Sequence, residues 1–588
     1  MAEKYWDIAP RARGQHLRRY TGMSPLLAQV LYNRGFTDPA EAIRFLHAND
    51  PASGRMLEFK GKKQSINDAL ARIRRAIKTG ERIVVYGDFD ADGVTSTALL
   101  VQVLKAMGAN VTPYIPHRVD EGYGLNAEAL LKIARSGAKL VITVDCGIRS
   151  VEEVEEGKAC GLDIIVTDHH SLGPDLPKAY SVINPKCDDC AYTEDMLAGV
   201  GVAYRLAEAL LTIEGNSGRN GRKLPDPDEL LDLVAIGTVA DLAPLDRPEN
   251  RALVRRGLEV LNNTNRPGIR ALMEVAGLRS GSILAMHIGF ALGPRINAAG
   301  RLDSADTALQ LLLTDDESEA IGLAQKLQAL NTQRQELTRA AQEIIRQQLE
   351  SEGLLDAPLI FAGDSDFKPG IVGLVAGRLT EEFYRPAVVM EYGEEESRAS
   401  CRSIPEFDIT SALDKCAGLL VRHGGHAQAA GFTVKNENIP ALREQLMELA
   451  HNALHGQELK PRLEIDAVVS AENISIELAE ELKALEPTGH HNSTPIFVSR
   501  GLRVLEMRTV GKESQHLKLK FARIGQPPLD AIGFNLADYQ PKPNDCVDVV
   551  YQLEINEWNG NRSVQLRMED IRPAKYDTMT GEDVVQVE

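Results

Sequence analysis

Between residues 64 and 245 the hydrophobic pattern switches repeatedly between helical and strand-like spacing. Segments with an apolar residue every three or four positions alternate with short runs of consecutive apolar, often β-branched residues. Such runs are typical of strands buried on both faces, and their alternation with helices predicts a parallel sheet. The expected helices cover 65–80, 93–108, 127–137 and 150–161, and the expected strands cover 81–88, 110–116, 138–147 and 162–170.

The spacing of hydrophobic residues also divides the rest of the chain into segments. Residues 316–353 lack proline and carry a thin apolar stripe among charges, which predicts a long solvated helix between domains. A second α/β pattern follows, and strands with little helix then predict a small barrel or sandwich. We expect an N-terminal cap at 1–63, an α/β core at 64–245, a helical connector at 246–354, a second α/β lobe at 355–455, a β-barrel at 456–575 and a flexible tail at 576–588.

Composition and charge limit the class of protein. With 43% hydrophobic and 26% charged residues, the 588-residue chain is neither disordered nor fibrous. Seven cysteines fit a reducing compartment, and no run reaches the ~18 apolar residues of a membrane span, so we expect a cytoplasmic protein. The net charge of −18 is unlike the basic footprint of most nucleic-acid binders. The excess acid is either a solvated surface or a set of carboxylates gathered around cations.

Acidic and histidine side chains follow three of the predicted strands. The carboxyl ends of parallel strands meet at one edge of a sheet, where functional residues lie on the loops. Asp241 lies in the otherwise apolar segment 230–245, where a buried carboxylate is costly unless it is paired or ligating. The strand-end residues are Asp88, Asp90 and Asp92 after the first strand, Asp145 after the third, and Asp168, His169 and His170 after the fourth.

Each of these motifs alone has an ordinary structural reading. An Asp-x-Asp-x-Asp-Gly run is often a turn or part of an EF-hand, although no Glu follows at the twelfth loop position here. A His-His pair is more often structural than catalytic. Their joint occurrence at successive strand ends predicts a site for two hard or borderline cations, Mn(II) or Mg(II), the machinery of phosphoryl hydrolysis.

In order, these motifs resemble the DHH phosphoesterase superfamily, and within it the RecJ family of single-strand-specific 5′→3′ DNA exonucleases. The resemblance covers nearly the whole chain and implies two α/β lobes, a DHH core with a parallel sheet and a DHH-associated domain, joined by a long helix and followed by an OB-fold β-barrel. It departs at Tyr86, where other DHH phosphatases carry a histidine. The matching segments are YGDFDADGVTS, TVDCG, VTDHH, the Asp241 segment, GPRINAAGR at 293–301, RASCRS at 398–403 and GGHAQAAGF at 424–432.

The resemblance also implies roles for individual residues. Asp145 is the expected bridge between two cations, with Asp88 and His170 as helpers and Asp168 orienting an imidazole from behind. How the ligands divide between the two ions is left open. The implied metal ligands are Asp90, Asp92, Asp145, His169 and Asp241.

For the substrate, the resemblance implies a grip on a 5′ phosphate by Arg118, Ser400, Arg402 and His426. Guanidinium groups and hydroxyls suit phosphate oxygens. The plain alternatives are that Arg118 and Arg402 form surface ion pairs and that residues 424–426 form a tight turn. Further residues are expected either to track the DNA backbone or to cross-link the lobes: Arg295, Asn297 and Arg301. Basic candidates in the barrel are Arg503, Arg508, Lys512, Lys518 and Lys520.

The implied function is a metal-dependent exonuclease that releases 5′-mononucleotides from single-stranded DNA in repair and recombination. Family resemblance adds a single-strand-binding protein and a RecQ-type helicase as partners, and no membrane. The alternatives are a phosphodiesterase for nanoRNA or cyclic dinucleotides, a pyrophosphatase, and a nonenzymatic single-stranded-DNA-binding scaffold. Cys187 and Cys190 are read as a free-thiol loop, because a structural zinc needs four ligands and no second such pair exists.

Overall fold

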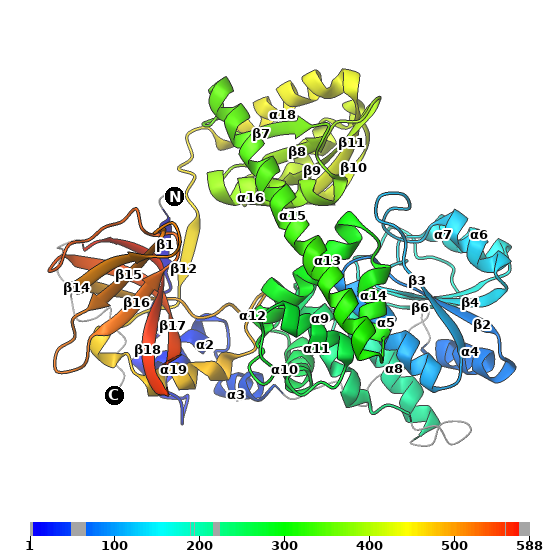
Figure 1. The fold of residues 1–588 in the computed structure, drawn as a ribbon, viewed down its shortest axis with the longest axis horizontal. Helices are drawn as coiled ribbons and strands as arrows, with labels where there is room; N and C mark the ends of the chain where they lie inside the picture. Colours follow the sequence, from blue (N-terminus) through cyan, green and yellow to red (C-terminus); the bar gives the residue numbers. More distant parts are fainter. Residues whose placement is uncertain are drawn as a thin grey trace. The chain divides into compact units, whose positions relative to one another are not determined.

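The computed structural model describes residues 4–48, 66–188, 190–192, 194–215, 224–558 and 560–574. The chain forms two compact units (Figure 1). One comprises Asp50–Leu459, and the other combines Ala2–Asn49 with Lys460–Glu588. The Asn-Gly pair at 559–560 predicts a turn between the last two strands, but Asn559 and the predicted tail lie outside the described residues.

The first unit begins with an all-parallel five-stranded sheet in the order β3-β2-β4-β5-β6. One face packs against α4 and α5, and the other packs against α6 and α7 (Figure 1). Both faces are buried, which confirms the reading of the apolar runs. The strand order reverses at β2 and β4, where such sheets open a crevice. The bounds are α4 (Ile66–Thr79), β2 (Arg82–Tyr86), α5 (Ala91–Ala106), β3 (Asn110–Tyr114), α6 (Ala127–Arg135), β4 (Ala138–Val144), α7 (Val151–Ala159), β5 (Asp163–Thr167) and β6 (Ser181–Ile183).

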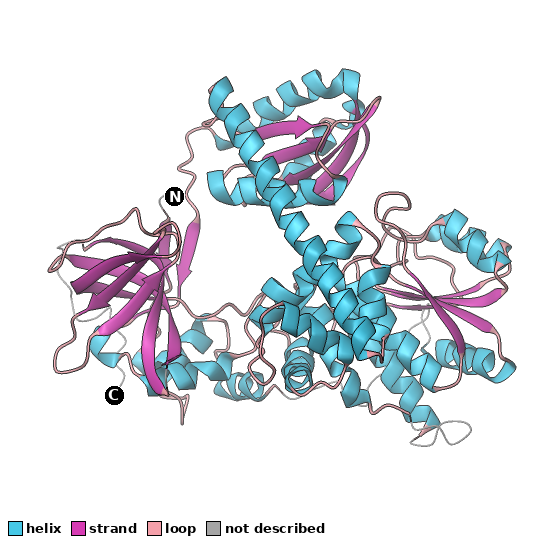
Figure 2. Cartoon of the chain, viewed as in Figure 1, coloured by secondary structure: helices cyan, strands magenta, loops and turns pink. Residues whose placement is uncertain are grey.

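A helical layer follows and ends in the long helix α15 (Glu317–Glu352). Its buried residues recur every three to seven positions, and Ala341, Ile345 and Leu349 pack into the core of the next lobe. The predicted long helix between lobes is therefore confirmed (Figure 2). The other bounds are α8 (Gly199–Glu214), η3 (Pro227–Leu230), α9 (Leu231–Ala240), α10 (Pro248–Asn262), α11 (Pro267–Val275), α12 (Ala285–His287), the π-helix η4 (Ile288–Leu292), α13 (Gly293–Leu302) and α14 (Asp306–Leu313).

The second α/β lobe holds a five-stranded sheet in the order β10-β11-β9-β8-β7. Only β7 and β8 run parallel; the other neighbours are antiparallel. The tight-turn reading of residues 424–426 is wrong, because they lie within β10 and the hairpin turns at Ala427 and Gln428. The bounds are β7 (Ile360–Asp364), α16 (Pro369–Phe383), β8 (Ala387–Glu391), β9 (Glu396–Arg402), α17 (Ile409–Lys415), η5 (Ala417–Leu419), β10 (Leu420–His426), β11 (Ala429–Lys435), η6 (Asn436–Asn438) and α18 (Ile439–Leu454).

The second unit is a barrel, closed because β14 pairs with both β15 and β17. The apolar side chains of α2 lie in the same core as the barrel strands, and β1 pairs with β12. No helix in the described part of the chain has the length and hydropathy that crossing a membrane requires. The bounds are β1 (Tyr5–Ile8), α1 (Gly14–Leu17), α2 (Pro25–Asn33), α3 (Pro39–His47), β12 (Arg462–Ile465), β13 (Ala467–Val468), η7 (Ala471–Asn473), α19 (Ile476–Leu482), η8 (Lys483–Leu485), β14 (Phe497–Val510), β15 (His516–Phe521), β16 (Leu529–Gly533), β17 (Cys546–Trp558) and β18 (Asn561–Pro573).

Candidate metal centre and phosphate-binding residues

The loop between β2 and α5 presents the first three carboxylates. Asp90 is the N-cap of α5, and its Oδ1 accepts hydrogen bonds from the backbone amides of Asp92 (3.0 Å) and Gly93 (3.1 Å). Asn297 of α13 accepts a 2.7 Å hydrogen bond from the amide of Ala91. These contacts hold the loop in one conformation, because an acidic N-cap satisfies amides that a helix leaves unpaired.

The predicted ligands converge at the carboxyl ends of β2, β4 and β5. Donor atoms in each of three groups lie within 4.8 Å of one another. His169 is central, since its Nε2 is 3.0 Å from Asp145, 3.7 Å from Asp241 and 3.9 Å from Asp92. The groups are Asp88, Asp90 and Asp145; Asp92, His169 and Asp241; and Asp145, His169 and His170.

The cluster has the properties of a cation site. Buried polar atoms in it make no hydrogen bond: Oδ1 of Asp88, and also Oδ1 of Asp145 and Nε2 of His169, which face each other at 3.0 Å without forming one. Burial and repulsion between carboxylates raise the pKa of Asp92 to about 7, and raise those of Asp88, Asp145 and Asp241 well above their usual value. Burial, followed by repulsion from His170, lowers the pKa of His169 to about 3, so its imidazole is neutral and free to ligate. Oxygen ligands with one or two imidazoles fit Mn(II) or Mg(II).

Asp92 also anchors a neighbouring helix. Its two carboxylate oxygens accept hydrogen bonds from the amides of Gly199 (2.7 Å) and Val200 (2.9 Å) at the start of α8. A Cβ atom on Gly199 would lie 2.6 Å from the side chain of Asp145. The bare glycine therefore lets the helix approach two predicted ligands at once.

Asp168 belongs to none of the three groups but contacts a member of one. Its Oδ2 accepts from the amide of Ile148 at 2.9 Å, and its Oδ1 contacts Nδ1 of His170 at 2.8 Å. Although burial opposes ionisation, the hydrogen bonds and attraction of His170 hold the pKa of Asp168 below its usual value. The reverse holds for His170, where burial lowers the pKa but the bond to Asp168 outweighs it and the pKa is raised. Asp168 is thus placed to orient His170.

Two tyrosines border the site. Tyr86, which stands where the resemblance expects a histidine, is fully buried and its hydroxyl donates to the carbonyl of Gly124, so it is no ligand. Tyr123 was not singled out in the sequence, yet its hydroxyl lies 3.0 Å from Nδ1 of His170. Its only sequence signal is its place in the loop that follows β3.

Arg118 is the expected phosphate ligand nearest the carboxylates. Its guanidinium lies 3.9 Å from the ring centre of Phe89, and its Nε is buried without a partner. Burial lowers the pKa of Arg118, while Asp88 and Asp90 act in the opposite direction. A buried, unpaired donor beside a cation site is suited to an anion.

Ser400 and Arg402 lie together on β9, with Arg402 Nη1 3.3 Å from Ser400 Oγ. Gly373 of α16 faces both, because a Cβ there would lie 3.0 Å from Ser400 Oγ and 3.5 Å from Arg402 Nη2. His426 is exposed on β10, separated from Arg402 by β11. The structure thus groups Ser400 with Arg402 and leaves His426 two strands away.

The residues of α13 make cross-links within the unit. Arg295 donates to Gln328 of α15 at 2.8 Å, and Arg301 donates to the carbonyl of Gly370 at 3.0 Å. Asn297 holds the Asp90 loop. Of the two readings kept for these residues, these contacts fit the cross-linking one.

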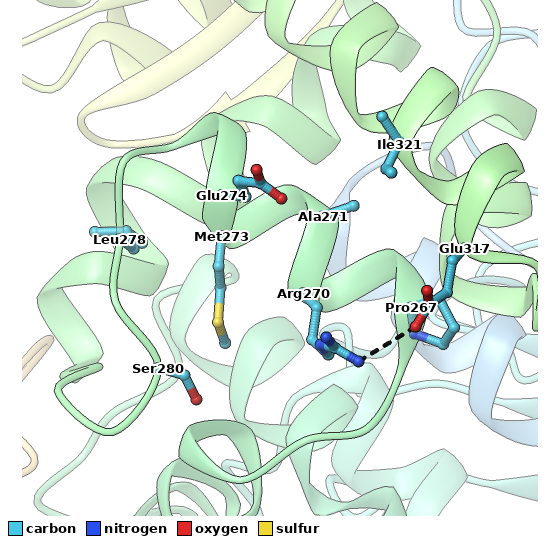
Figure 3. A pocket seen from close by; sticks show the side chains of 9 residues that line it. All are labelled: Pro267, Arg270, Ala271, Met273, Glu274, Leu278, Ser280, Glu317 and Ile321. Carbon is cyan, nitrogen blue, oxygen red and sulfur yellow. Dashed lines mark ion pairs between the residues drawn. The ribbon is translucent and has the colours of Figure 1, made fainter.

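Other features lie apart from the cluster. A pocket of about 440 Å³ between α11 and α15 is lined by apolar and polar side chains in similar number, and its Arg270 is paired with Glu317 at 3.5 Å (Figure 3). Cys187 is buried and Cys190 is half-buried, and neither belongs to a group of potential metal ligands among the described residues.

Comparison with known proteins gives a consistent assignment. Family models match as "DHH family, N-terminal domain" at 82–238, "DHHA1 domain" at 356–452 and "RecJ OB domain" at 465–570. The single-stranded-DNA-specific exonuclease RecJ of Bacillus subtilis is 40% identical over 97% of this chain and 71% of its own length. That of Salmonella typhimurium is 38% identical over 94% of this chain and 96% of its own.

Comparison with solved structures leads to the same family. The crystal structure of Thermus thermophilus RecJ with Mn²⁺ matches with a TM-score of 0.81 and 32% identity, covering 97% of this chain and 80% of that one. The Mg²⁺ complex matches with a TM-score of 0.74 and 30% identity, covering 97% and 78%. The expected architecture of two α/β lobes and an OB barrel is thereby confirmed, and the chain belongs to the RecJ family of the DHH proteins.

Proposed function

We propose that the protein hydrolyses single-stranded DNA from its 5′ end and releases 5′-mononucleotides with the help of two divalent cations. The observation that carries this proposal is the convergence of unpartnered acidic and imidazole groups at the sheet edge, in a chain of the RecJ family. The residues that would hold the cations are Asp90, Asp92, Asp145, His169 and Asp241, with Asp88 beside them. Such cations, when bound, activate water and stabilise charge on the scissile phosphate.

The chain's own residues prepare this chemistry. Asp168 holds a proton on Nδ1 of His170, so His170 presents Nε2 to its surroundings. The raised pKa of His170 favours a second proton on Nε2. We propose that His170 donates this proton to the 3′ oxygen that leaves when the phosphodiester bond breaks. Arg118, Ser400 and Arg402 bind the 5′-terminal phosphate, and their separation from the carboxylates sets the point of cleavage. This separation gives the enzyme its 5′→3′ direction.

The barrel supplies a surface for the strand. Phe534 follows β16 and is 51% exposed. Its ring centre lies 5.1 Å from that of His516, in an edge-on arrangement, and 6.0 Å from the guanidinium of Arg567. Lys518 pairs in register with Ile532 on the next strand, and Lys520 is held by Glu506. An exposed aromatic ring beside an arginine can stack a base without reading sequence. We assign this role to Phe534.

A degradation assay tests the function. End-labelled single-stranded and double-stranded DNA are incubated with Mn(II), and product length and direction are followed. We expect mononucleotides from the 5′ end of single strands, and loss of turnover in His169→Ala but not in the exposed His455→Ala. Faster hydrolysis of dinucleotides or pyrophosphate than of long strands would favour the compact-substrate alternatives. Strand binding without metal binding would favour the scaffold.

The setting is also part of the proposal. We propose that the enzyme acts in the cytoplasm during repair and recombination, on strands exposed by a RecQ-type helicase and covered by a single-strand-binding protein. Family resemblance supports these partners. Co-purification of each partner with the full chain, with and without DNA, tests for direct contact.

A further inference from the structure

A lysine beside the proposed metal centre has no bonded partner in the described part of the chain. Lys186 follows β6, in the segment that leads to α8. The residue is half-buried, and its ammonium group takes part in no hydrogen bond or ion pair with the described residues. An ammonium that is partly withdrawn from water is costly to hold unless an anion pairs with it. The free donors of Lys186 are therefore suited to a bound anion.

The backbone of Lys186 is fixed against the segment that carries the two histidines. Asn184 is fully buried, and its Nδ2 donates to the carbonyl of His170 at 3.1 Å. Its Oδ1 accepts the backbone amide of Lys186 at 2.8 Å. The amide of Asp168 donates to the carbonyl of Ile183 at 3.1 Å, which ties the same two segments together once more. The lysine side chain thus starts from a fixed point next to the predicted ligands.

The charge of Lys186 acts on one group of these ligands. Burial and neighbouring carboxylates raise the pKa of Asp241, and the positive charge of Lys186 opposes the rise. Burial and His170 lower the pKa of His169, and Lys186 lowers it further. Nε2 of His169 lies 3.7 Å from Asp241, so one ammonium can be near both. It is close to Asp241 without pairing with it.

Two cations therefore border different parts of the cluster. Arg118 is attracted by Asp88 and Asp90, whose charges act against the effect of burial on its pKa. Lys186 acts instead on the group that contains Asp241. In the proposed function Arg118 binds the 5′-terminal phosphate. A strand that starts at Arg118 and crosses the carboxylates then brings a phosphate beyond the cut to Lys186.

We propose that Lys186 binds the phosphate that follows the scissile one and holds the downstream strand across the metal centre. An ammonium is a compact charge with rotatable donors, so it can release one phosphate and accept the next as the strand advances. This inference rests on the proposed function. It adds a positioning residue on the 3′ side of the cut, where the residues considered so far leave the strand unheld.

The test removes the charge from either side of this contact. The substrate is a 5′-phosphorylated single strand whose second internucleotide linkage is a neutral methylphosphonate, and release of the first nucleotide with Mn(II) is measured. For the wild type we expect kcat/KM to fall roughly tenfold when this linkage is neutralised. Lys186→Gln should show the lower value already on the native strand and no further loss on the modified one.

Two variants serve as controls for the cleavage assay. Lys186→Arg keeps the positive charge and should retain both the rate and its sensitivity to the methylphosphonate. Lys178→Gln removes an exposed lysine from the preceding loop and should behave as the wild type. A methylphosphonate at the sixth linkage should leave the rate of the first cleavage unchanged in every variant.

Binding gives a second readout that needs no turnover. For single strands each phosphate contact contributes a slope of about −0.7 to the logarithm of affinity against the logarithm of salt concentration. Anisotropy in EDTA should therefore show a shallower slope for Lys186→Gln, by about that amount.

Several results would overturn the inference. One is a wild type that cleaves the methylphosphonate strand at the native rate, a result that requires no variant. Others are a Lys186→Gln variant that stays as sensitive to this linkage as the wild type, or one with an unchanged salt slope. Tighter Mn(II) binding by Lys186→Gln with unchanged DNA parameters would assign the charge to the carboxylates instead. Absence of 5′→3′ cleavage by the wild type would overturn the proposed function itself.

Discussion

Oδ1 of Asp168 lies 2.8 Å from Nδ1 of His170, and the same oxygen accepts the backbone amide of His170 at 3.0 Å. The carboxylate therefore fixes both the ring and its tautomer. An asparagine amide at this position could either accept a hydrogen bond from Nδ1 or donate one to it. It would therefore no longer fix a proton on Nδ1.

We expect Asp168→Asn to lower kcat by about 10- to 100-fold while the protein still folds. The measurement is steady-state cleavage of single-stranded DNA, with circular dichroism to check the fold. Asp175→Asn, an exposed aspartate in the following loop, is the control. Equal rates for the two variants would remove Asp168 from its orienting role.

The stability of the metal-free protein should depend on pH. Burial and mutual repulsion raise the pKa of Asp92 to about 7, and that of Asp145 well above its usual value. Each group then keeps a proton in the folded state that the unfolded chain has lost. Stability therefore falls as pH rises from about 4, where the unfolded chain loses these protons, to about 7, where folded Asp92 loses its own, by up to about 1.4 kcal/mol per pH unit for each retained proton.

Thermal unfolding in EDTA at several pH values measures this dependence. His169 acts in the opposite direction below about pH 6.5, because only the unfolded chain protonates its imidazole there, but it offsets just one of the several retained carboxyl protons. His170, whose pKa is raised, adds to the fall once the pH exceeds about 6.5. With saturating Mn(II) the slope should flatten or reverse, because bound metal displaces the protons. A metal-free melting temperature that rises over this interval would contradict the prediction.

Gly199→Ala should weaken metal binding, although Gly199 is not itself a predicted ligand. The new Cβ atom would lie 2.6 Å from Asp145, so either the carboxylate or α8 must shift. We expect at least a tenfold loss of Mn(II) affinity, measured by calorimetry. Gly322→Ala, at a helical position with open space around the added atom, should leave the affinity unchanged.

Phe534→Ala should weaken binding of long single strands by about 1–3 kcal/mol, because a stacking surface is lost. Anisotropy with a labelled oligonucleotide in EDTA measures it. Ile524→Ala removes another exposed apolar side chain of the barrel unit, 84% exposed, and serves as the control. A similar effect of both substitutions would speak against stacking at Phe534.

Much of the α/β architecture followed from local pattern. The run at 81–88 predicted a buried strand, and β2 occupies Arg82–Tyr86 within it. Asp88 and Asp145 could be predicted to meet because both follow parallel strands. Contacts between distant segments could not be predicted this way. The bond from Ala91 to Asn297 joins residues 206 positions apart, and no local pattern marks Asn297 as its acceptor.

Arg334 shows the same limit. In the sequence it is one cation within a charged helix, and such residues usually face solvent. Its bonds to Oδ1 of Asn331 lie within α15 itself, whereas its repulsion of Arg301 on α13 arises only when the two helices are brought together. Likewise, glycines at 424 and 425 suggested a turn, whereas pairing with β11 extends β10 through them.

The sharing of one core by α2 and the barrel has a consequence for biosynthesis. Leu26, Leu27, Val30 and Leu31 pack with strands that begin after residue 460. At a translation rate of about 5–20 residues per second, these side chains wait about half a minute to two minutes for their partners. The apolar face of α2 thus stays unburied on the nascent chain until the barrel strands have been made, which suits it to binding by a ribosome-associated chaperone.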